Sequence, residues 1–455
     1  MLVTDYDWER RLGLFPDTTR LRGEREDERL EIGGCDLSEL ASQYGTPLYV
    51  YDAATMDGAV RAYRRALAAS YPAASGITYA AKAFLCLAIA QWTRQHGLCI
   101  DCSSAGEVAI AVAGGAERQS LIVHGVNKSQ DDLETALAHA GTIVVDNLSE
   151  LDRIRALVEG RTGQLPDLWL RLRPGTSVAT HAYTQTGQHG SKFGMHPDEV
   201  HEAVRLCLEQ GLPLTGLHFH LGSQFHDPGP VASALALALD LMAVLQEEHR
   251  WVPEVLCPGG GWGVAYCEDD LPQPSIVDYV KLMARQIADG CRQRKLSLPR
   301  LQLEPGRSLI ARAGVAIYRV GALKESAGLR WLLVDGGLAD NPRPALYGSR
   351  YTALPVSQPR QPGGDPVSIA GPYCESSDVL IEDLGLPELG PDELLAVPVS
   401  GAYQLSMANN YNGARRPAVL WLRGGSAHPM QQREQMEDLL RRDLLLSGAA
   451  IEPAL

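Results

Sequence analysis

One lysine stands alone inside a long apolar segment of the sequence. The segment GITYAAKAFLCLAIA covers residues 76–90, and Lys82 is its single charged residue. An ammonium group buried among apolar side chains is costly unless it is paired or loses its charge. Lys82 therefore either extends its methylene stem to reach water or supplies an amine to a buried site. The segment alone leaves both interpretations open.

Three later segments carry polar groups that could share a site with such an amine. Glycines 259–261 in CPGGGWG let backbone N–H groups surround a phosphate, although a tight turn would use the same residues. His218 and His220 face the same side of a strand, where they could bind a metal with a third ligand or stack an imidazole on an aromatic ring. Glu304 follows an apolar run and needs a cationic partner, either Arg307 or a protonated ring nitrogen.

Together these groups match the requirements of one cofactor. A phosphate cradle, an amine for a Schiff base, an imidazole and a carboxylate facing a pyridinium nitrogen are what pyridoxal 5'-phosphate (PLP) needs. We therefore predict a PLP site and no metal site. Cys99 and Cys102 form a C-x-x-C pair, but without a second pair this spacing favours two strand residues over a zinc or redox site.

The candidate residues follow a regular alternation of strand-like and helix-like segments. Eight β-rich runs lie between residues 76 and 310, separated mostly by helix-patterned stretches such as SQDDLETALAHA. This alternation predicts a parallel α/β fold, and the count of eight favours a closed (β/α)8 barrel, whose strand ends meet at one mouth. The residues that follow the eight runs are, in order, Lys82; Asp101 and Ser103; His124 and Asn127; Asp146; Arg171 and Arg173; His218 and His220; glycines 259–261; and Glu304 and Arg307.

The pattern changes after residue 312. Strand-like runs such as AGVAIYRVGALKES and LRWLLVDGG are joined there by turns rich in glycine and proline, with one helix-like stretch near QQREQMEDLLRRDLL. We predict a PLP-binding barrel over residues 47–312 and a mostly β domain built from residues 1–46 and 313–455. The N-terminal part contributes LEIGGCDLSELASQYG, a strand-helix fragment that does not fit the barrel count.

The composition limits the classes of partner. The 455 residues carry a net charge of −14, which argues against nucleic acid or an anionic membrane as the main partner. The N-terminal MLVTDYDWERRLGLF lacks the pattern of a secretory leader, and no run approaches the ~18 apolar residues of a transmembrane helix. Nine scattered cysteines are typical of reduced thiols. We expect a cytoplasmic protein.

Seven motifs in a fixed order give the sequence a family resemblance. They are YAAKAF, HFHLGSQ, GGGWGVAY, EPGRS, RPALYG, GPYCESSD and SGAYQLSMANNYN. With these motifs the sequence resembles the fold type III, alanine-racemase-like PLP decarboxylases, and among them the diaminopimelate decarboxylases. The resemblance covers residues 35–440 and implies a (β/α)8 barrel followed by a β domain. It further implies PLP-dependent decarboxylation of meso-2,6-diaminopimelate to L-lysine and CO2, the last step of lysine biosynthesis.

The resemblance also implies a role for each residue around the cofactor. Lys82 corresponds to the lysine that forms the Schiff base, and His220 to the imidazole stacked on the PLP ring. Glu304 matches the partner of the pyridine nitrogen. The remaining cofactor-binding positions are Ser223 and Gly259, Gly260 and Gly261 for the phosphate, and Tyr403, which also borders the substrate.

The substrate end of the site is implied in the same way. Arg307, Arg343 and Tyr347 match residues that hold the distal carboxylate of the substrate, and the last two lie four apart in RPALYG. Cys374 and Glu375 belong to the C-E-S motif, which in this family reaches the site from a second subunit, so a homodimer with shared active sites is implied. The final proton donor is then Cys374 or Lys82.

Glu375 bears on the choice of substrate. Ornithine-type relatives carry an aspartate at this position, whereas here Glu375 can pair with a distal ammonium while the arginines hold a distal carboxylate. Both ends of meso-diaminopimelate carry these groups. Three alternatives stay open: a decarboxylase for another basic or carrier-bound amino acid, an amino-acid racemase, which in this fold is shorter and lacks the C-E-S motif, and a non-catalytic PLP-binding protein. Departures from the family pattern, such as AFLCLA after Lys82, concern specificity more than chemistry.

Overall fold

The computed structural model describes residues 6–175 and 190–446 of the chain. Eight parallel strands close into a barrel, in which each strand pairs with the next in sequence and β12 returns to β5. The predicted eight-stranded barrel is confirmed. Its strands are β5 (Ser75–Ala80), β6 (Cys99–Cys102), β7 (Leu121–Val123), β8 (Thr142–Val145), β9 (Asp167–Arg171), β10 (Leu214–His218), β11 (Val255–Cys257) and β12 (Arg300–Leu303).

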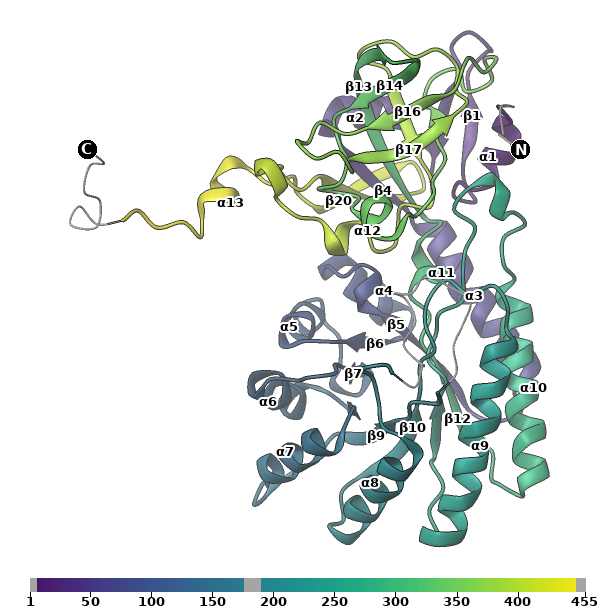
Figure 1. The fold of residues 1–455 in the computed structure, drawn as a ribbon, viewed down its shortest axis with the longest axis vertical. Helices are drawn as coiled ribbons and strands as arrows, with labels where there is room; N and C mark the ends of the chain where they lie inside the picture. The colour runs from purple at the N-terminus through teal and green to yellow at the C-terminus, as the bar shows by residue number, and fades with distance from the viewer. Residues whose placement is uncertain (1–5, 176–189, 447–455) are drawn as a thin grey trace.

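Helices connect these strands around the outside of the barrel (Figure 1). Several of them begin with a side-chain cap: the Ser104 hydroxyl accepts from the backbone N–H of Glu107, and Ser129 forms a reciprocal capping box with Asp132. These caps satisfy backbone N–H groups of the first turn and so favour a helix start at these residues. The helices are α3 (Ala53–Ser70), α4 (Leu87–Gln95), α5 (Ala105–Ala113), α6 (Gln130–His139), α7 (Leu148–Val158), α8 (Pro197–Glu209), α9 (Gly229–His249), α10 (Ile276–Arg294) and α11 (Arg307–Ile310).

Helix α9 is long and strongly apolar. It is the one described helix whose length and composition would suffice to cross a membrane, although Asp240 interrupts its apolar run. It contacts α8 and α10 and buries eight of its side chains, among them Leu235 and Leu245. Its apolar character is therefore explained by packing on the barrel.

The second domain is a mostly β structure, as predicted. Its nine-stranded sheet follows the order β17-β16-β14-β13-β4-β19-β20, with β18 and β15 branching from β13. Its strands are β4 (Leu48–Asp52), β13 (Gly314–Ser326), β14 (Leu329–Val334), β15 (Leu354–Pro355), β16 (Val367–Ala370), β17 (Val379–Leu384), β18 (Leu394–Val397), β19 (Ala418–Arg423) and β20 (Ser426–Gln431). The short helices α12 (Arg343–Tyr347) and α13 (Met436–Leu440) belong to the same part of the chain.

Strand β4 joins the two parts of the chain. It runs antiparallel to β13 and parallel to β19, so it lies in the middle of the second sheet. The predicted boundary at residue 47 counts residues 48–52 with the barrel, and the pairing places them in the other sheet instead. All five of its residues are buried, and a fully buried apolar run is typical of both kinds of strand. The remaining domain limits stay a prediction.

The N-terminal segment packs against the second domain. It contains α1 (Trp8–Leu12), α2 (Leu37–Tyr44) and a small sheet of β1 (Arg20–Arg22), β2 (Arg29–Ile32) and β3 (Cys35–Asp36). Leu30 and Leu37 share a buried apolar cluster with Val315 and Leu354 of the larger sheet. The backbone N–H of Leu30 also donates to the carbonyl of Val356 at 2.9 Å. The strand-helix fragment therefore does not belong to the barrel.

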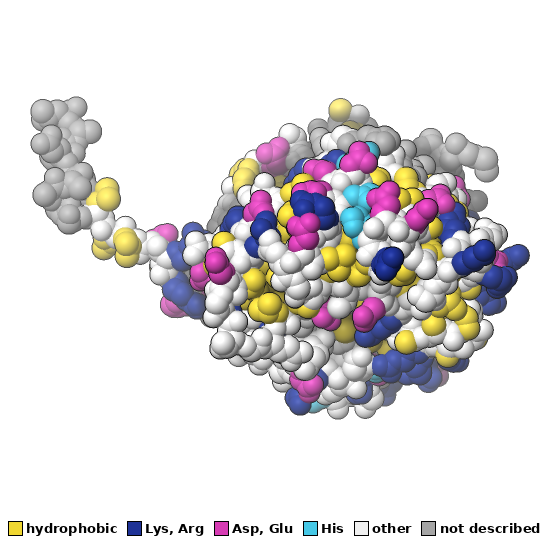
Figure 2. Space-filling view, turned by 90° about the horizontal axis from the view of Figure 1, so that it is seen from below, with side chains coloured by type: hydrophobic (Ala, Val, Ile, Leu, Met, Phe, Trp, Pro, Cys, Tyr) yellow, Lys and Arg dark blue, Asp and Glu magenta, His cyan; other side chains and the backbone are white. Residues whose placement is uncertain are grey.

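Two features of the surface are the charge distribution on the barrel and the exposed C-terminal segment. Figure 2 shows the face of the barrel opposite the second domain, where Lys and Arg side chains are interspersed with Asp and Glu. The C-terminal segment extends away from the body in both views (Figures 1 and 2). It carries exposed Leu440, Leu444 and Leu445.

Candidate active site

A cavity of about 760 Å³ lies between the barrel and the second domain. Its walls contain predicted residues from six of the eight strand ends, which confirms that these six ends converge on one mouth. Asp146 and Arg173 do not line this cavity; Arg173 instead faces Glu199 at 3.8 Å. Glycines 259–261 do not line it either, but Gly260 and Gly261 line a smaller pocket together with Lys82 and His220. The predicted residues that line the cavity are Lys82, Asp101, Ser103, His124, Asn127, Arg171, His218, His220, Ser223, Glu304, Arg307, Arg343, Tyr347 and Tyr403.

Lys82 lies on the 3-10 turn Ala81–Ala83 that follows β5. Its Nζ is 3.6 Å from Oδ2 of Asp101, at the end of the neighbouring β6, and 48% of its side chain is open to the cavity. Burial lowers the pKa of Lys82. The Asp101 carboxylate and, to a smaller extent, other nearby groups raise it, and together they outweigh burial, so the net pKa lies above its ordinary value. The lysine does not snorkel to the outer surface: its amine faces the cavity.

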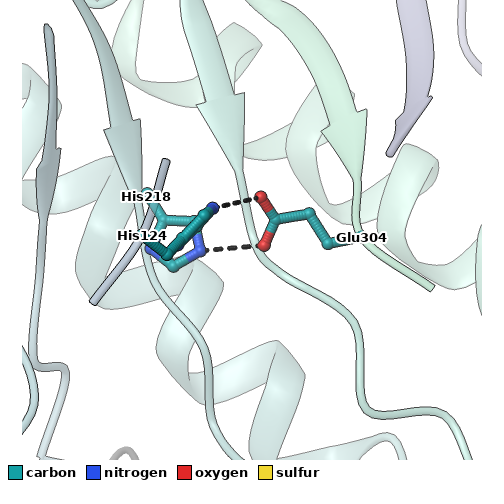
Figure 3. A group of neighbouring side chains, drawn as sticks. All are labelled: His124, His218 and Glu304. Carbon is teal, nitrogen blue, oxygen red and sulfur yellow. Dashed lines mark hydrogen bonds and ion pairs between the residues drawn. The ribbon is translucent and has the colours of Figure 1, made fainter. Parts of the chain in front are cut away.

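Glu304 lies directly after β12, and its carboxylate faces the imidazoles of His124 and His218 (Figure 3). Its Oε1 is 3.1 Å from Nε2 of His124, and its Oε2 is 3.0 Å from Nε2 of His218. Burial lowers the pKa of His218 to about 4 despite the nearby carboxylate. Burial raises the pKa of Glu304, but the two histidines outweigh it, and the net pKa is well below its ordinary value. Glu304 is therefore an anion that accepts two hydrogen bonds.

The glycines after β11 pass close to two other strand ends. A Cβ on Gly260 would lie 2.1 Å from the carbonyl oxygen of Glu304, and one on Gly259 would lie 2.6 Å from Nδ1 of His220. Gly259 and Gly261 also have φ values of +75° and +103°, which favour glycine. The backbone is thus brought against His220 with no side chain between, which is the approach that a phosphate cradle needs.

Replacing Gly260 with alanine is expected to weaken PLP binding at least about 10-fold, because the added Cβ must displace the backbone of Glu304. Gly190→Ala is the matched control, since nothing lies within 4 Å of its Cβ position. The measurement is PLP binding to cofactor-free protein by fluorescence titration. Equal PLP affinity in the two variants would contradict the cradle.

Arg307 links the glycine-lined end of the cavity to its second-domain wall. Its guanidinium donates to the Ser223 hydroxyl at 2.8 Å and to the Tyr266 hydroxyl. Its Cζ also lies 4.5 Å from the ring centroid of Tyr403. Arg307 is 6% exposed and faces no carboxylate among the described ion pairs, so its charge is available to an anionic ligand.

Arg343 and Tyr347 lie at the two ends of helix α12, so one turn presents both, as predicted. The Arg343 guanidinium donates to the Tyr351 hydroxyl and lies 4.7 Å from the ring centroid of Tyr266. Burial raises the pKa of Tyr266, but the charges of Arg307 and Arg343 outweigh it, and the net pKa lies below its ordinary value. These two buried arginines form a positively charged wall of the cavity.

Sequence reasoning missed two tyrosines of this wall. Tyr266 lies in GGGWGVAY, five residues after Gly261, and Tyr351 follows RPALYG by three residues. Neither stands at a strand end, so the strand-end pattern could not single them out. The sequence marked them only by position: Tyr266 lies within a family motif, and Tyr351 lies close to one.

Cys374 and Glu375 stand apart from this cavity in the single chain. Both are exposed, and neither lines the cavity. The backbone N–H of Cys374 donates to Oδ1 of Asn412 at 2.9 Å, which fixes the C-E-S loop against residues 409–416. One chain therefore does not bring this predicted pair to the site. Cys99 and Cys102 are strand residues with free thiols, as predicted.

The residues present fit PLP. An amine, a glycine-lined cradle beside His220 and Ser223, and an ionised Glu304 held inside the barrel supply one partner for each polar part of that cofactor. The pyridoxal-binding domain model of the pyridoxal-dependent decarboxylases matches residues 56–311.

Relatives of known name extend this match over nearly the whole chain. Diaminopimelate decarboxylase of Halalkalibacterium halodurans is 39% identical over 439 residues, covering 95% of this chain and 98% of that protein. The Bacillus subtilis enzyme is 40% identical over 91% of this chain and 95% of its own. The chain belongs to the diaminopimelate decarboxylase family. Members of this family are PLP-dependent lyases.

Solved structures of diaminopimelate decarboxylases share the fold. The structure from M. jannaschii is 29% identical, with a TM-score of 0.86 over 96% of this chain and 99% of that one. A second M. jannaschii structure, in complex with L-lysine, has the same TM-score over 94% of this chain and 98% of that one. Barrel and second domain are therefore arranged here as in that family.

Proposed function

We propose that this chain decarboxylates meso-2,6-diaminopimelate and releases L-lysine and CO2. The observation that carries the proposal is the pairing, in one cavity, of the Lys82 amine with the two buried arginines Arg307 and Arg343. A substrate that carries an amino acid group at each end can place one end at Lys82 and its distal carboxylate at the arginines. L-Lysine and L-ornithine lack the distal carboxylate, so they would leave this buried positive charge without a partner.

Each cofactor-binding residue has a defined task in this proposal. Lys82 would hold PLP covalently, His220 would support its ring, and the Glu304 carboxylate would accept a hydrogen bond from its protonated ring nitrogen. Ser223, glycines 259–261 and Tyr403 would hold the phosphate end. When bound, PLP supplies an electron sink for the electron pair that stays on Cα as the carboxylate leaves as CO2.

The chain's own groups position the substrate and return a proton. Arg343 and Tyr347 on α12 and the neighbouring Arg307 hold the distal carboxylate and so orient Cα. After CO2 leaves, a proton must reach Cα to give L-lysine. Its donor is the Lys82 Nζ or the Cys374 Sγ of a second copy of the chain. In either case the transfer takes place inside a cavity closed by the second domain.

We further propose a homodimer in which each cavity is completed by the C-E-S loop of the other subunit. Its support is the exposure of Cys374 and Glu375 in the single chain, together with their absence from the cavity wall. Exposed thiols are uncommon outside functional surfaces. In the dimer, Glu375 would face the distal ammonium of the substrate. A cytoplasmic location stays a prediction.

Mixing two inactive variants tests the shared site. Lys82→Ala and Cys374→Ala dimers, unfolded and refolded together, are expected to regain about a quarter of wild-type activity, because half the dimers are mixed and one of their two sites is intact. Each variant refolded alone is the control. If the mixture is no more active than its parts, Cys374 and Lys82 act in the same subunit.

The substrate is tested by offering the PLP-loaded protein four amino acids in parallel. CO2 release and the amine product are measured with meso-2,6-diaminopimelate, L-ornithine, L-arginine and L-lysine. Turnover of the first alone, with L-lysine as product, is expected. Turnover of another amino acid would keep the cofactor site but overturn the role of the arginines, and no turnover of any of the four would reject the proposed substrate.

A further inference from the structure

Three strand ends converge on a single carboxylate in the barrel. His124 follows β7, His218 ends β10 and Glu304 follows β12, so residues 180 and 86 positions before Glu304 in the sequence meet it here. The two imidazole rings lie 4.8 Å apart at 70° to each other and point their Nε2 atoms at different oxygens of the carboxylate (Figure 3). All three side chains are buried. Each oxygen of the Glu304 carboxylate thus has its own imidazole partner.

The donor atom of His218 follows from its surroundings. Its Nδ1 is buried and has no hydrogen-bond partner, whereas its Nε2 lies 3.0 Å from Oε2 of Glu304. A buried N–H without an acceptor costs more than an unused lone pair beside apolar groups. The neutral ring therefore carries its hydrogen on Nε2 and donates it to Glu304. Protonation of Nδ1 would create a buried charge with no partner on that side.

His124 holds the other oxygen in the same manner. Its Nε2 lies 3.1 Å from Oε1 of Glu304 and 3.7 Å from Oδ1 of Asp101. That Asp101 oxygen is itself buried without a hydrogen-bond partner, so the shorter contact to Glu304 is the bond that is made. Each carboxylate oxygen keeps a second lone pair, which leaves Glu304 able to accept one more donor.

We infer that His124 and His218 are positioning residues that fix Glu304 as an oriented anion and thereby set its strength as the acceptor for the ring nitrogen of PLP. The inference rests on the proposed role of Glu304. Neither histidine touches the reacting atoms in this account; each acts through the carboxylate. With one donor removed, the carboxylate gains rotational freedom and is protonated more easily.

The same three groups could hold a metal ion by spacing alone, since their ligand atoms all lie within 4.8 Å of one another. A metal there would occupy the lone pairs that PLP needs. Both histidine bonds to Glu304 are already of hydrogen-bond length, which favours the direct contacts.

The test compares two substitutions of His218 in the full-length protein. His218→Leu removes the donor, and His218→Gln keeps an N–H donor on a side chain of similar length. His139→Leu, on the exposed face of α6, is the control. The measured quantities are the PLP dissociation constant of cofactor-free protein between pH 6 and pH 8, kcat and KM with meso-2,6-diaminopimelate, and bound zinc by elemental analysis.

The expected result is a selective loss. His218→Leu should raise the PLP dissociation constant and lower kcat, each about 10- to 100-fold, with little change in KM, while His218→Gln should recover most of both. The loss of PLP affinity relative to wild type should grow as the pH falls. In His218→Leu the pKa of Glu304 is higher than in the wild type, so its carboxylate becomes protonated at a higher pH. Using the ratio to wild type cancels the titration of Lys82. The ionisable groups that interact with this carboxylate are Lys82, Cys99, His124, Arg171, His218, His220 and Cys257, and Asp101 lies beside His124.

Three outcomes would overturn the inference. Unchanged PLP affinity in His218→Leu would show that the bond does not matter for the cofactor, and equal losses in the Leu and Gln variants would assign the effect to packing. Stoichiometric zinc in the wild type, lost in His218→Leu, would assign the cluster to a metal. If His218→Leu does not fold, His124→Leu and His124→Gln carry the same comparison. Because PLP affinity is read without turnover, failure of the substrate assignment leaves this test intact.

Discussion

Replacement of Lys82 with alanine is expected to lower kcat for meso-2,6-diaminopimelate by at least about 1,000-fold. The Lys82 amine lines the cavity at the ends of β5 and β6, where it lies 3.6 Å from Asp101. Lys128 also borders the cavity, but its Nζ is fully buried and bonded to Glu150 at 2.7 Å and to the carbonyl of Val144. No described neighbour can therefore substitute for the Lys82 amine.

The control for this experiment is Lys281→Ala, an exposed lysine on α10. It should retain wild-type kcat, and both variants should retain the wild-type melting temperature within a few degrees. The Lys82 variant is also expected to lose PLP on dialysis, since its covalent attachment is gone. Decarboxylation by Lys82→Ala at even a tenth of the wild-type rate would remove Lys82 from the mechanism.

Arg343→Leu is expected to lower kcat/KM for meso-2,6-diaminopimelate by about 100- to 1,000-fold. Arg343 is 5% exposed, and its guanidinium contacts Tyr266 and Tyr351 but no carboxylate among the described ion pairs, so its charge is available to a ligand. Because the proposed contact is to the distal carboxylate of the substrate and not to the cofactor, the PLP dissociation constant should not change in the variant.

Two further variants define the cause of that loss. Arg343→Lys keeps the positive charge but not the planar fork, so it should recover only part of the rate. Arg285→Leu, at an arginine whose side chain is 86% exposed, should leave kcat/KM unchanged. A full rate for Arg343→Leu, or a loss of PLP affinity as large as the loss of kcat/KM, would show that Arg343 does not bind the distal carboxylate.

The barrel could be predicted because its signal is local and repeated. Each strand is a short, mostly buried run such as residues 142–145, and each is followed by a helix, five of which have a side-chain N-cap, so eight repeats fix the count even if one boundary is misplaced. Strand β4 could not be placed in this way. Its partners β13 and β19 lie more than 260 residues later in the chain, and no local pattern distinguishes a central strand of one sheet from a strand of the other.

The residues of the site also differ in how far the sequence could predict them. Strand-end residues such as Lys82 and Glu304 were predictable because parallel strands bring their carboxyl ends together. The roles of Arg343 and Tyr403 came from the family resemblance, because their place over the barrel mouth depends on how the second domain packs. The hydrogen bonds from His124 and His218 to Glu304 were not foreseen, since they depend on side-chain directions across three strands.

The central claim is PLP-dependent conversion of meso-2,6-diaminopimelate to L-lysine at Lys82. Its most direct test measures CO2 and L-lysine together during turnover by PLP-loaded wild-type protein, with the Lys82→Ala variant in parallel. The account predicts the two products in equal amounts from the wild type and neither from the variant. CO2 without L-lysine, or equal product from both proteins, would contradict it.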